Sequence, residues 1–573
     1  MKFTNTLRLE FEHVYPEEKQ IEVIEYLKLV TKETLLSIIG FANTYPQPNF
    51  DNFASNLDIR RDTINRVIHY CHKNNIKGKP QLVSRESSLK LAEIIFSNKE
   101  VLIDDNNNPK NIDSDEINLF KSFLVINKEV NSKQKLTTSE NEENRESLAQ
   151  MMIAMSFSTS DLGVFKDSTF EFGKLVYCAI ERFEILIEFL NSDSDYQYLT
   201  DDVCSYFKVK SIDKLRKHVK YLFSQLLILK TKNSYKFNVD DDDESKLFLD
   251  TLISNEIDID DDFTVLKNYP LYKIDDEIYS VIDHFFVVDK FYKSVRFILK
   301  ESFNKNHGLS NKDRTFFEFF NTKFSEEFLM KTILDKVFNR PHYFKKYQNI
   351  NKPYEPDYYL RDGKTIFIFE NKDVLIRKDI KSSGDIDKIL NIFKDKFFEN
   401  NGKPIGIGQL INSILQIVEN NFDYDNYVNT KKNFTIYPIL LVNDRILEIP
   451  GVNYILNQWY LKSVKEKLKE KYNHNFTKNL TIIDIDTIVF GSNYFTKTNN
   501  NFKNFIENHQ KEMSIVLKPD GRTLEEVEES INRNLMKQFS PISFRFPIDE
   551  FSQSLFIEKF KEIITEDNEV EST

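Results

Sequence analysis

Two short runs of large apolar residues, joined by a turn sequence, place the strongest constraint on how this chain can fold. The stretch EPDYYLRDGKTIFIFENKD, residues 355–373, carries aromatic and β-branched residues on both sides of Arg361-Asp362-Gly363. Such runs favour β-strands, and a glycine-containing turn between them favours a hairpin. The sequence therefore predicts two neighbouring antiparallel strands that carry acids at positions where an apolar core does not need them.

Strand alternation gathers charged residues at one end of this hairpin. Glu370 and Lys372 share a face because residues two apart in a strand do so, while Asn371 points to the other face. Pairing of the two strands brings Asp357 near Glu370. Two carboxylates supply the oxygen ligands that Mg²⁺ prefers, and an ammonium group beside them can act on a metal-bound water. The pattern predicts a hard-cation site; the alternative is salt-bridged acids at a sheet edge with a surface lysine.

The motif Pro356-Asp357, followed at the end of the next predicted strand by Glu370-Asn371-Lys372, resembles the PD-(D/E)XK nuclease superfamily. The resemblance implies a restriction-endonuclease-like fold and covers residues 316–443, with the flanks matching only loosely. It implies that Asp357 and Glu370 bind Mg²⁺, or Mn²⁺, with the carbonyl of Asn371 as a further ligand. It also implies that Lys372 orients or deprotonates the attacking water.

Helical patterns on both sides of the hairpin agree with this resemblance. Upstream, FFEFFNTKFSEEFLMKTILDKVF has helical periodicity and carries Glu326 and Glu327, each a candidate additional metal ligand or a solvated boundary residue. The phase of the apolar stripe favours Glu326. Downstream, GDIDKILNIFKDKFF predicts an amphipathic helix that covers one face of the sheet.

A second downstream helix is predicted by KPIGIGQLINSILQIVENN, with Gln409 near its start. The resemblance implies that Gln409 hydrogen-bonds the scissile phosphate or positions Lys372; the alternative is a polar residue at a helix start beside two glycines. FTIYPILLVND is nearly continuous in apolar residues and predicts a buried central strand, and LTIIDIDTIVF predicts another. The order of these elements predicts an α/β core with a mixed sheet.

Two polar segments predict the division of the chain into parts. Residues 127–147 and the acidic run 239–245 lack apolar periodicity. We therefore predict a helical, helix-turn-helix-like part, a winged-helix-like part, and a nuclease-like domain with a lead-in and a C-terminal extension. Their predicted ranges are 1–126, 148–238 and 246–573.

The first two parts contain candidate DNA-binding helices. YLTDDVCSYFKVKSIDKLRKHVKYLFSQLLILKTKNSYKFN predicts helix, turn and helix, and then a β-hairpin over residues 226–238, which resembles a winged helix-turn-helix. NFDNFASNLDIRRDTINRVIHYCHKNNI predicts only a short helix to Leu57, a break at Asp58 and a second helix from Arg61.

The second helix of such a unit presents a polar face to a DNA groove. The alternative is a protein-docking or spacer module in which the lysines solvate a helical face. The candidate DNA contacts are Lys210, Lys214, Arg216, Lys217 and Lys220, the wing residues Lys230, Lys232 and Lys236, and Arg60, Arg61 and Arg66.

The composition limits other classes of protein. A net charge of -12 over 573 residues argues against a uniformly basic coat for nucleic acid, so positive potential must be local. No apolar run approaches the roughly 20 residues of a membrane span, and the N-terminus lacks a signal-peptide core. The widely separated Cys71, Cys178 and Cys204 favour a reducing cytoplasm. The histidines form no zinc motif, so His284 is expected to be an ordinary polar residue.

The sequence thus predicts a Mg²⁺-dependent endonuclease that hydrolyses phosphodiester bonds in DNA, for which host defence is a natural context of the family. One alternative is a non-catalytic DNA-binding or scaffold protein with a remnant nuclease fold. Another is a nuclease that acts on RNA. The low net basicity also leaves room for a homo-oligomer or a protein partner that completes the DNA cleft. No membrane partner is expected.

Overall fold

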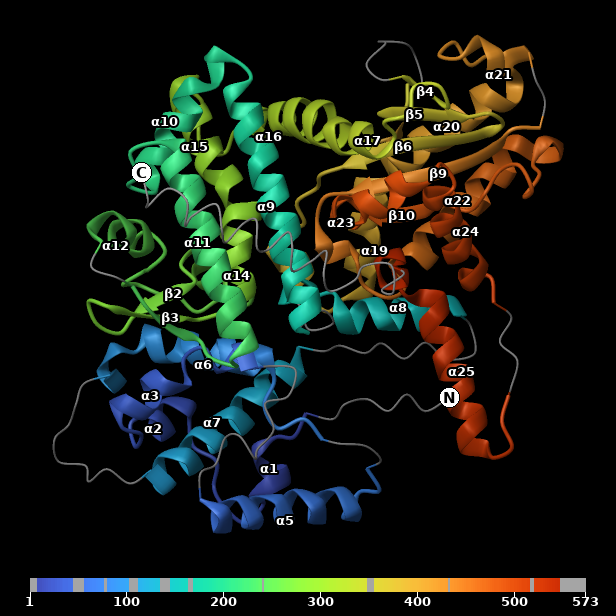
Figure 1. Ribbon diagram of the computed structural model, residues 1–573. Coiled ribbons are helices and arrows are strands. Elements are labelled where there is room, and N and C mark those ends of the chain that lie inside the picture. The colour runs from blue at the N-terminus through green and yellow to red at the C-terminus, as the bar shows by residue number, and fades with distance from the viewer. Residues whose placement is uncertain are drawn as a thin grey trace. The chain divides into compact units, whose positions relative to one another are not determined.

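The fold is taken from a computed structural model, which describes most of the chain. The described residues are 8–44, 56–76, 80–102, 112–133, 145–162, 168–239, 242–347, 355–430, 433–515 and 520–546. They form two compact units, both discontinuous in sequence (Figure 1). Unit 1 takes its described residues from 1–134 and 162–309, and unit 2 takes its own from 135–161 and 310–546.

Unit 1 is mainly helical and contains a small antiparallel sheet in the order β1-β3-β2. The strands are β1 (Lys236–Asn238), β2 (Leu271–Lys273) and β3 (Ile278–Val281). Because β1 pairs with β3 across the acidic run 239–245, that run lies inside unit 1. The predicted lead-in to the nuclease-like domain also lies in unit 1.

The helices of unit 1 include α1 (Phe11–Val14), α2 (Val23–Leu27), α3 (Lys32–Ile38), α5 (Leu57–Lys73), α6 (Arg85–Ser97), α7 (Ile112–Ser132), α9 (Thr169–Asn191), α10 (Gln197–Tyr206), α11 (Ile212–Thr231), α12 (Asp243–Asp250), α13 (Thr264–Asn268), α14 (His284–Asp289), the π-helix η5 (Lys290–Ser294) and α15 (Val295–Asn306).

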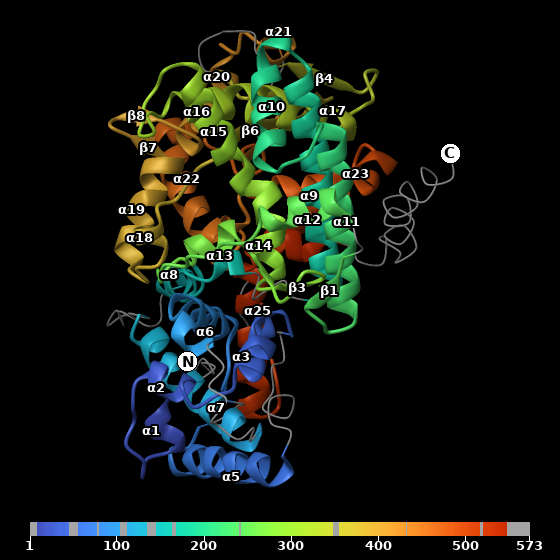
Figure 2. The ribbon, with the colours of Figure 1, turned by 90° about the vertical axis from the view of Figure 1, so that its left-hand side faces the viewer.

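Helices α9, α10 and α11 lie side by side, and a short turn joins α10 to α11 as predicted (Figure 2). The predicted hairpin over residues 226–238 is wrong, because α11 continues to Thr231. Leu226 and Leu229 extend the buried helical stripe of Leu215, Val219 and Leu222, so this segment gains more by remaining helical. Only residues 236–238 form a strand, and β3 supplies its partner.

The predicted break at Asp58 is also wrong, because α5 is continuous from Leu57 to Lys73. The side-chain oxygen of Asn56 accepts the main-chain N–H groups of Asp58 and Ile59, at 2.9 and 3.3 Å, and so caps the helix. Asp58 therefore lies in the first turn, where the positive end of the helix favours an acid. Residues 45–55, which hold most of the predicted preceding helix, lie outside the described part of the chain.

Unit 2 contains a mixed five-stranded sheet in the order β10-β9-β6-β5-β4, which confirms the predicted α/β class. Strands β10, β9 and β6 are parallel, and β6, β5 and β4 are antiparallel. The strands are β4 (Phe344–Tyr347), β5 (Tyr358–Asp362), β6 (Thr365–Lys372), β9 (Thr435–Val442) and β10 (Thr481–Asp484), with a separate pair, β7 (Glu399–Asn400) and β8 (Lys403–Pro404).

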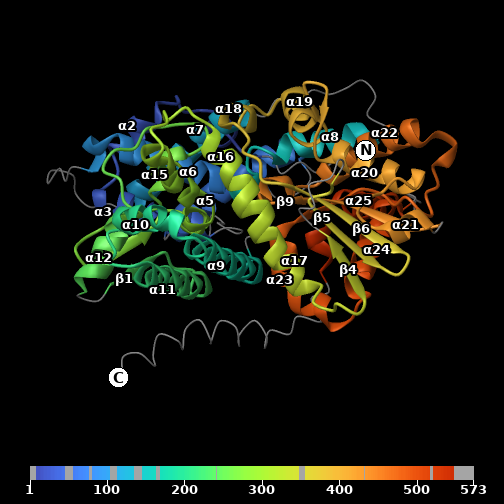
Figure 3. The ribbon, with the colours of Figure 1, turned by 90° about the horizontal axis from the view of Figure 1, so that it is seen from above.

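Helices cover both faces of this sheet (Figure 3). Ile366 and Ile368 face a core shared with α8, α19, α20 and α22, whereas Phe367 and Phe369 face α17 and α24. The helices of unit 2 are α8 (Arg145–Ser156), α16 (Thr315–Phe319), the π-helix η6 (Phe320–Met330), α17 (Lys331–Val337), α18 (Lys378–Lys381), α19 (Ile386–Phe397), α20 (Ile407–Glu419), α21 (Asn426–Thr430), α22 (Val452–Leu468), α23 (Ile485–Lys497), α24 (Asn501–Met513) and α25 (Leu524–Phe539).

Most predicted elements of the core are present. The β5–β6 hairpin turns at Gly363, whose φ of 55° suits glycine, and α19, α20 and β9 form where their patterns predict. The predicted strand LTIIDIDTIVF is only half right. Its second half is α23, because the Asp484 side chain accepts the Asp486 N–H and starts a helix there.

None of the helices formed by the described residues is both long enough and apolar enough to span a membrane.

Candidate functional site

The hairpin brings the predicted acids and lysine together at one end of the sheet. The antiparallel register of β5 and β6 places Asp357, directly before β5, opposite Glu370. The main-chain N–H of Asn371 donates to Asp357 Oδ2 at 2.7 Å, and Lys372 Nζ donates to Glu370 Oε2 at 3.4 Å. The end of the hairpin therefore carries two facing carboxylates with one ammonium group beside them.

The Glu370 carboxylate is the least satisfied group of this set. Its side chain is 0% exposed, and its Oε1 atom is buried without a hydrogen-bond partner among the described residues. A buried charge without full pairing is costly, so such a group is normally either protonated or bound to a cation. The orphaned oxygen is thus an observation that favours a cation ligand.

Burial disfavours the charged forms of the two carboxyl groups. Burial raises the pKa of Glu370 well above its usual range, repulsion from Asp357 adds to the rise, and attraction to Lys372 opposes it. Burial likewise raises the pKa of Asp357, against the attraction of Lys372 and the Asn371 N–H. Burial alone would lower the pKa of Lys372, but the surrounding carboxylates raise it. The lysine therefore offsets only part of what burial costs the charged carboxylates.

Of the two candidate acids on the upstream helix, the structure brings Glu326 to this cluster. Burial and repulsion from Asp357 raise the pKa of Glu326 to about 8, while Lys372 lowers it. Glu327 instead accepts from Lys323, one turn away, at 2.8 Å. Both acids lie in η6, and π-helical segments of this kind often occur at functional sites.

Gln409 lies in the first turn of α20, which begins after Gly406. Its Oε1 accepts the Gly406 N–H at 2.7 Å, as a helix cap does. Gly406 has a φ of 49°, and a Cβ built there would lie 3.3 Å from Lys372 Cε. The described residues offer no acceptor to Gln409 Nε2. The Gln409 oxygen thus caps the helix, which is the structural alternative given in the sequence analysis. The amide nitrogen remains available for a ligand.

Sequence reasoning missed two polar residues that lie next to this site. Asn443 Nδ2 donates to Ser325 Oγ at 2.6 Å and to Asn371 Oδ1 at 3.0 Å, and Asn371 Nδ2 donates to Ser325 Oγ at 3.1 Å. The one available signal was an asparagine directly after a buried strand, in FTIYPILLVN. Nothing in the pattern around Ser325 singles that residue out.

The donors at this site suit a hard cation. Among the described residues, no group of three or more His, Cys, Asp or Glu side chains is arranged to hold a metal ion. Two facing carboxylates, the Asn371 carbonyl and the nearby Glu326 carboxylate nevertheless provide only oxygen donors, which Mg²⁺ and Mn²⁺ accept. Together with the orphaned Glu370 oxygen, this donor set fits such an ion.

The candidate DNA-binding residues of α11 are partly neutralised. Arg216 and Lys220 pair with Glu184 of α9 at 3.0 and 3.1 Å, and Lys214 lies 3.5 Å from Glu244. Lys210 and Lys217 are exposed. Of the predicted wing residues, Lys232 and Lys236 are exposed, whereas Lys230 is buried and donates to the Asn43 carbonyl at 3.3 Å. The structure therefore leaves a smaller basic surface than the sequence indicates.

The arginines of α5 differ in their surroundings. Arg66 pairs with Glu17 and Asp62 and lies over the Tyr15 ring, 5.1 Å from its centroid. Arg61 is 77% exposed and lies 3.9 Å from Asp58, and Arg60 is partly buried. Only Arg61 is open to solvent in the way that a phosphate contact requires.

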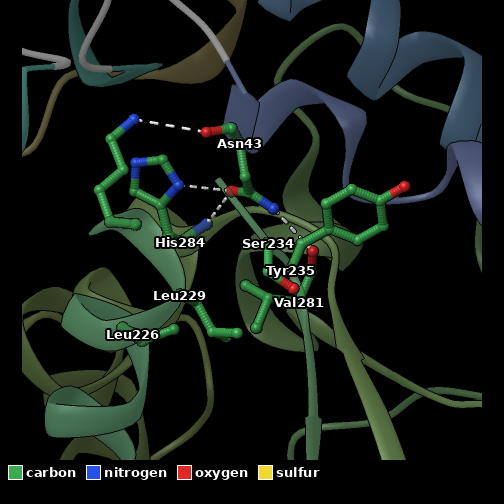
Figure 4. A pocket seen from close by; sticks show the side chains of 8 residues that line it. Asn43, Leu226, Leu229, Ser234, Tyr235, Val281 and His284 are labelled. Carbon is green, nitrogen blue, oxygen red and sulfur yellow. Dashed lines mark hydrogen bonds between the residues drawn. The ribbon is translucent and has the colours of Figure 1, made fainter. Parts of the chain in front are cut away.

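A small cavity in unit 1 lies beside the buried His284 (Figure 4). Its volume of about 10 Å³ leaves room for at most one water molecule. His284 Nδ1 is hydrogen-bonded to Asn43 Oδ1 at 2.5 Å, and Asn43 Nδ2 donates to the Val281 carbonyl at 2.7 Å. These contacts join the polar groups of a core, as expected for an ordinary buried histidine.

Comparison of the chain with protein-family models, curated proteins and solved structures finds no match.

Proposed function

We propose that this protein is a Mg²⁺-dependent nuclease that hydrolyses phosphodiester bonds in DNA. The observation that carries the proposal is the buried Glu370 Oε1, which no described residue hydrogen-bonds and which faces a second carboxylate, Asp357. The order of β4, β5, β6, α20 and the parallel β9 supports the proposal, because it agrees with the restriction-endonuclease-like core that the motif implies.

The oxygen donors of the cluster would hold the metal ion. Asp357 and Glu370 are the primary ligands in this proposal, with the Asn371 carbonyl and Glu326 as further donors. A bound Mg²⁺ or Mn²⁺ would polarise the scissile phosphate and lower the pKa of a bound water.

Lys372 would act as a fixed positive charge at the reacting phosphate. The neighbouring carboxylates hold the proton on its amine, since they raise its pKa above the usual value. An ammonium group in this position can donate a hydrogen bond to the attacking water and stabilise the negative charge that develops on the phosphate. The start of α20 lies beside Lys372, and its N–H groups favour an anion at the same place.

The experiment that tests the proposal compares cleavage of several nucleic acids. The full chain is incubated with supercoiled DNA, linear DNA, single-stranded DNA and RNA in Mg²⁺, Mn²⁺ or EDTA. We expect metal-dependent cleavage of DNA, and a loss of about 10²- to 10⁴-fold in Lys372→Ala. Lys388→Ala is the control, because Lys388 is 63% exposed on α19 and forms an ion pair with Asp385 of the same helix start, at 3.5 Å. Equal activity of wild type and Lys372→Ala, or inactivity on every substrate, would overturn the proposal.

We further propose that α10 and α11 contact DNA in the manner of a helix-turn-helix. The exposed Lys210 and Lys217, with the half-exposed Lys214, support this proposal because they lie in the turn and on the outer face of α11. Binding that persists in EDTA without any cleavage would instead favour the non-catalytic DNA-binding alternative.

A further inference from the structure

A closed network of three buried polar side chains lies on the face of β6 opposite the acids. Ser325, Asn371 and Asn443 are 0%, 6% and 3% exposed, and each of the three is hydrogen-bonded to the other two. Hydrogen bonds between buried side chains fix the relative positions of the elements that carry them. This network therefore forms a junction between three elements.

The junction connects three elements that meet at the candidate site. Ser325 belongs to η6, Asn371 lies next to the end of β6, and Asn443 directly follows β9. Ser325 and Asn371 connect directly to the acid cluster, and Asn443 is hydrogen-bonded to both of them. Ser325 precedes Glu326, and the main-chain N–H of Asn371 holds Asp357 at 2.7 Å.

The π-helical form of η6 makes this anchoring necessary. Long π-helical segments are rare, and a sequence keeps one only where other contacts select it over the α-helix. Ser325 contacts Asn371 on one face of the sheet, while the adjacent Glu326 interacts with the acids on the other side of the strand end. A return to α-helical geometry would rotate these two consecutive residues and separate one of them from its partners.

We propose that Ser325, Asn371 and Asn443 are positioning residues that hold η6 in its π-helical register and thereby keep the Glu326 carboxylate beside Asp357 and Glu370. The inference rests on the proposed function, because it places Glu326 among the ligands of the metal ion. Ser325 and Asn443 act through the helix and the strand ends, and neither touches the substrate.

Hydrogen exchange in the full chain tests the positional part of the inference without any metal. We expect amides of residues 320–330 to exchange at least tenfold faster in Ser325→Ala and in Asn443→Ala than in wild type. Asn457→Ala is the matched control, because Asn457 is equally buried and its Oδ1 accepts the Leu480 N–H at 2.9 Å, away from η6. Unchanged exchange over 320–330 in both network variants would overturn the inference.

Titration with Mn²⁺ tests the functional part. Loss of a group that orients a ligand typically lowers metal affinity 10- to 100-fold, so we expect about a tenfold loss in Ser325→Ala. In a Glu326→Gln background the same substitution should cost less than twofold, because the residue that it positions is gone. Two results would overturn this inference but not the proposed function. One is an equal loss of Mn²⁺ affinity in the two backgrounds. The other is wild-type Mn²⁺ affinity in Ser325→Ala while Glu370→Ala binds no Mn²⁺. If wild type binds no Mn²⁺, the metal site of the proposed function fails, and the exchange rates still decide whether the network holds η6.

Discussion

The two units handle their charged residues in opposite ways. On α11 of unit 1, Arg216 and Lys220 share Glu184, and all three side chains keep contact with solvent. In unit 2, Glu370 is fully buried, Asp357 is partly buried, Lys372 lies beside them, and no described residue hydrogen-bonds Glu370 Oε1. The first arrangement pairs two positive charges with a carboxylate that solvent reaches, whereas the second places a carboxyl group in the interior, where burial disfavours its charged form.

This difference separates charges that support folding from charges that suggest chemistry. Surface pairs such as those on α11 each contribute at most about 1 kcal/mol. A buried carboxyl group without a full set of partners costs free energy in the unliganded protein, and such groups occur often at binding and catalytic sites. The density of charged residues in the sequence suggests α11 as the functional site, but the burial of the carboxyl groups favours the end of β6.

The largest expected effect is that of Glu370→Gln, which removes the buried charge and keeps the shape. We expect cleavage activity to fall by about 10²- to 10⁴-fold, because a metal ligand is lost. Stability in EDTA at pH 8 should rise by roughly 1–4 kcal/mol, since the folded protein disfavours the charged form of this group. Denaturant unfolding checks the second expectation. Glu184→Gln is the counterpart in unit 1 and should lower stability by up to about 1 kcal/mol.

Glu326→Gln should change the dependence of stability on pH. The folded protein raises the pKa of Glu326 from its usual 4.5 to about 8, so between these values it binds more protons at this carboxyl than the unfolded chain. The protonated Glu326 carboxyl therefore contributes stability that is fully present below pH 4.5 and is lost as the pH rises to 8. Each pKa unit corresponds to about 1.4 kcal/mol, and the total is reduced because solvent reaches this side chain. At pH 8 the free energy of unfolding of Glu326→Gln should therefore exceed that of wild type by up to about 3 kcal/mol.

The measurement is urea unfolding in EDTA at pH 4.5 and pH 8. The matched control is Glu327→Gln, whose side chain pairs with Lys323 at the surface. A gain of the same size for Glu326→Gln at both pH values would contradict the expectation.

Gly406→Ala should destabilise unit 2 and disturb the lysine. The added Cβ would lie 2.8 Å from the Phe397 carbonyl and 3.3 Å from Lys372 Cε, at a φ of 49°. Backbone strain of this kind costs roughly 1–3 kcal/mol, measurable by thermal or denaturant unfolding. Gly402→Ala separates strain from contact, because Gly402 also has a positive φ but no atom within 4 Å of its Cβ position. A smaller loss in Gly406→Ala than in Gly402→Ala would show that the contact with Lys372 is unimportant.

The smallest expected effect concerns DNA binding by α11. Lys210→Ala/Lys217→Ala, which removes the two exposed lysines, should lower the slope of log K against log salt concentration by about 2, because each lost phosphate contact removes about 0.9. Arg216→Ala/Lys220→Ala should leave the slope nearly unchanged, because Glu184 already neutralises these side chains. Fluorescence anisotropy at several salt concentrations measures both slopes, and equal slopes in the two double variants would contradict the assignment of the DNA-facing side of α11.

The sequence predicts the core of unit 2 better than the helices of unit 1 for a physical reason. Alternation and turn chemistry are local signals, and they were sufficient for the β5–β6 hairpin and for the placement of Asp357 opposite Glu370. The end of α11 and the partner of β1 depend on contacts between distant segments. Residues 236–238 pair with 278–280, and no local pattern at either place names the other.

In the candidate site, too, local sequence patterns predict some residues and not those that depend on contacts between distant segments. The apolar phase of the upstream helix favoured Glu326 over Glu327, and the structure brings Glu326 to the acids. The π-helical geometry of η6 and the bonds of Ser325 and Asn443 could not be predicted, because they arise only where three elements meet.

The discontinuity of unit 2 has a consequence for how the molecule is made. Helix α8 precedes the whole second segment of unit 1, yet it packs against α19 and α22, where the Ala149 carbonyl would lie 2.6 Å from a Cβ on Gly451. At 5–20 residues per second, a ribosome needs roughly 12–46 s to travel from the end of α8 to the start of α19, the first of these two partners. During that interval neither α19 nor α22 is available to cover the apolar side of α8, so a chaperone or a temporary contact would shield it in the emerging chain.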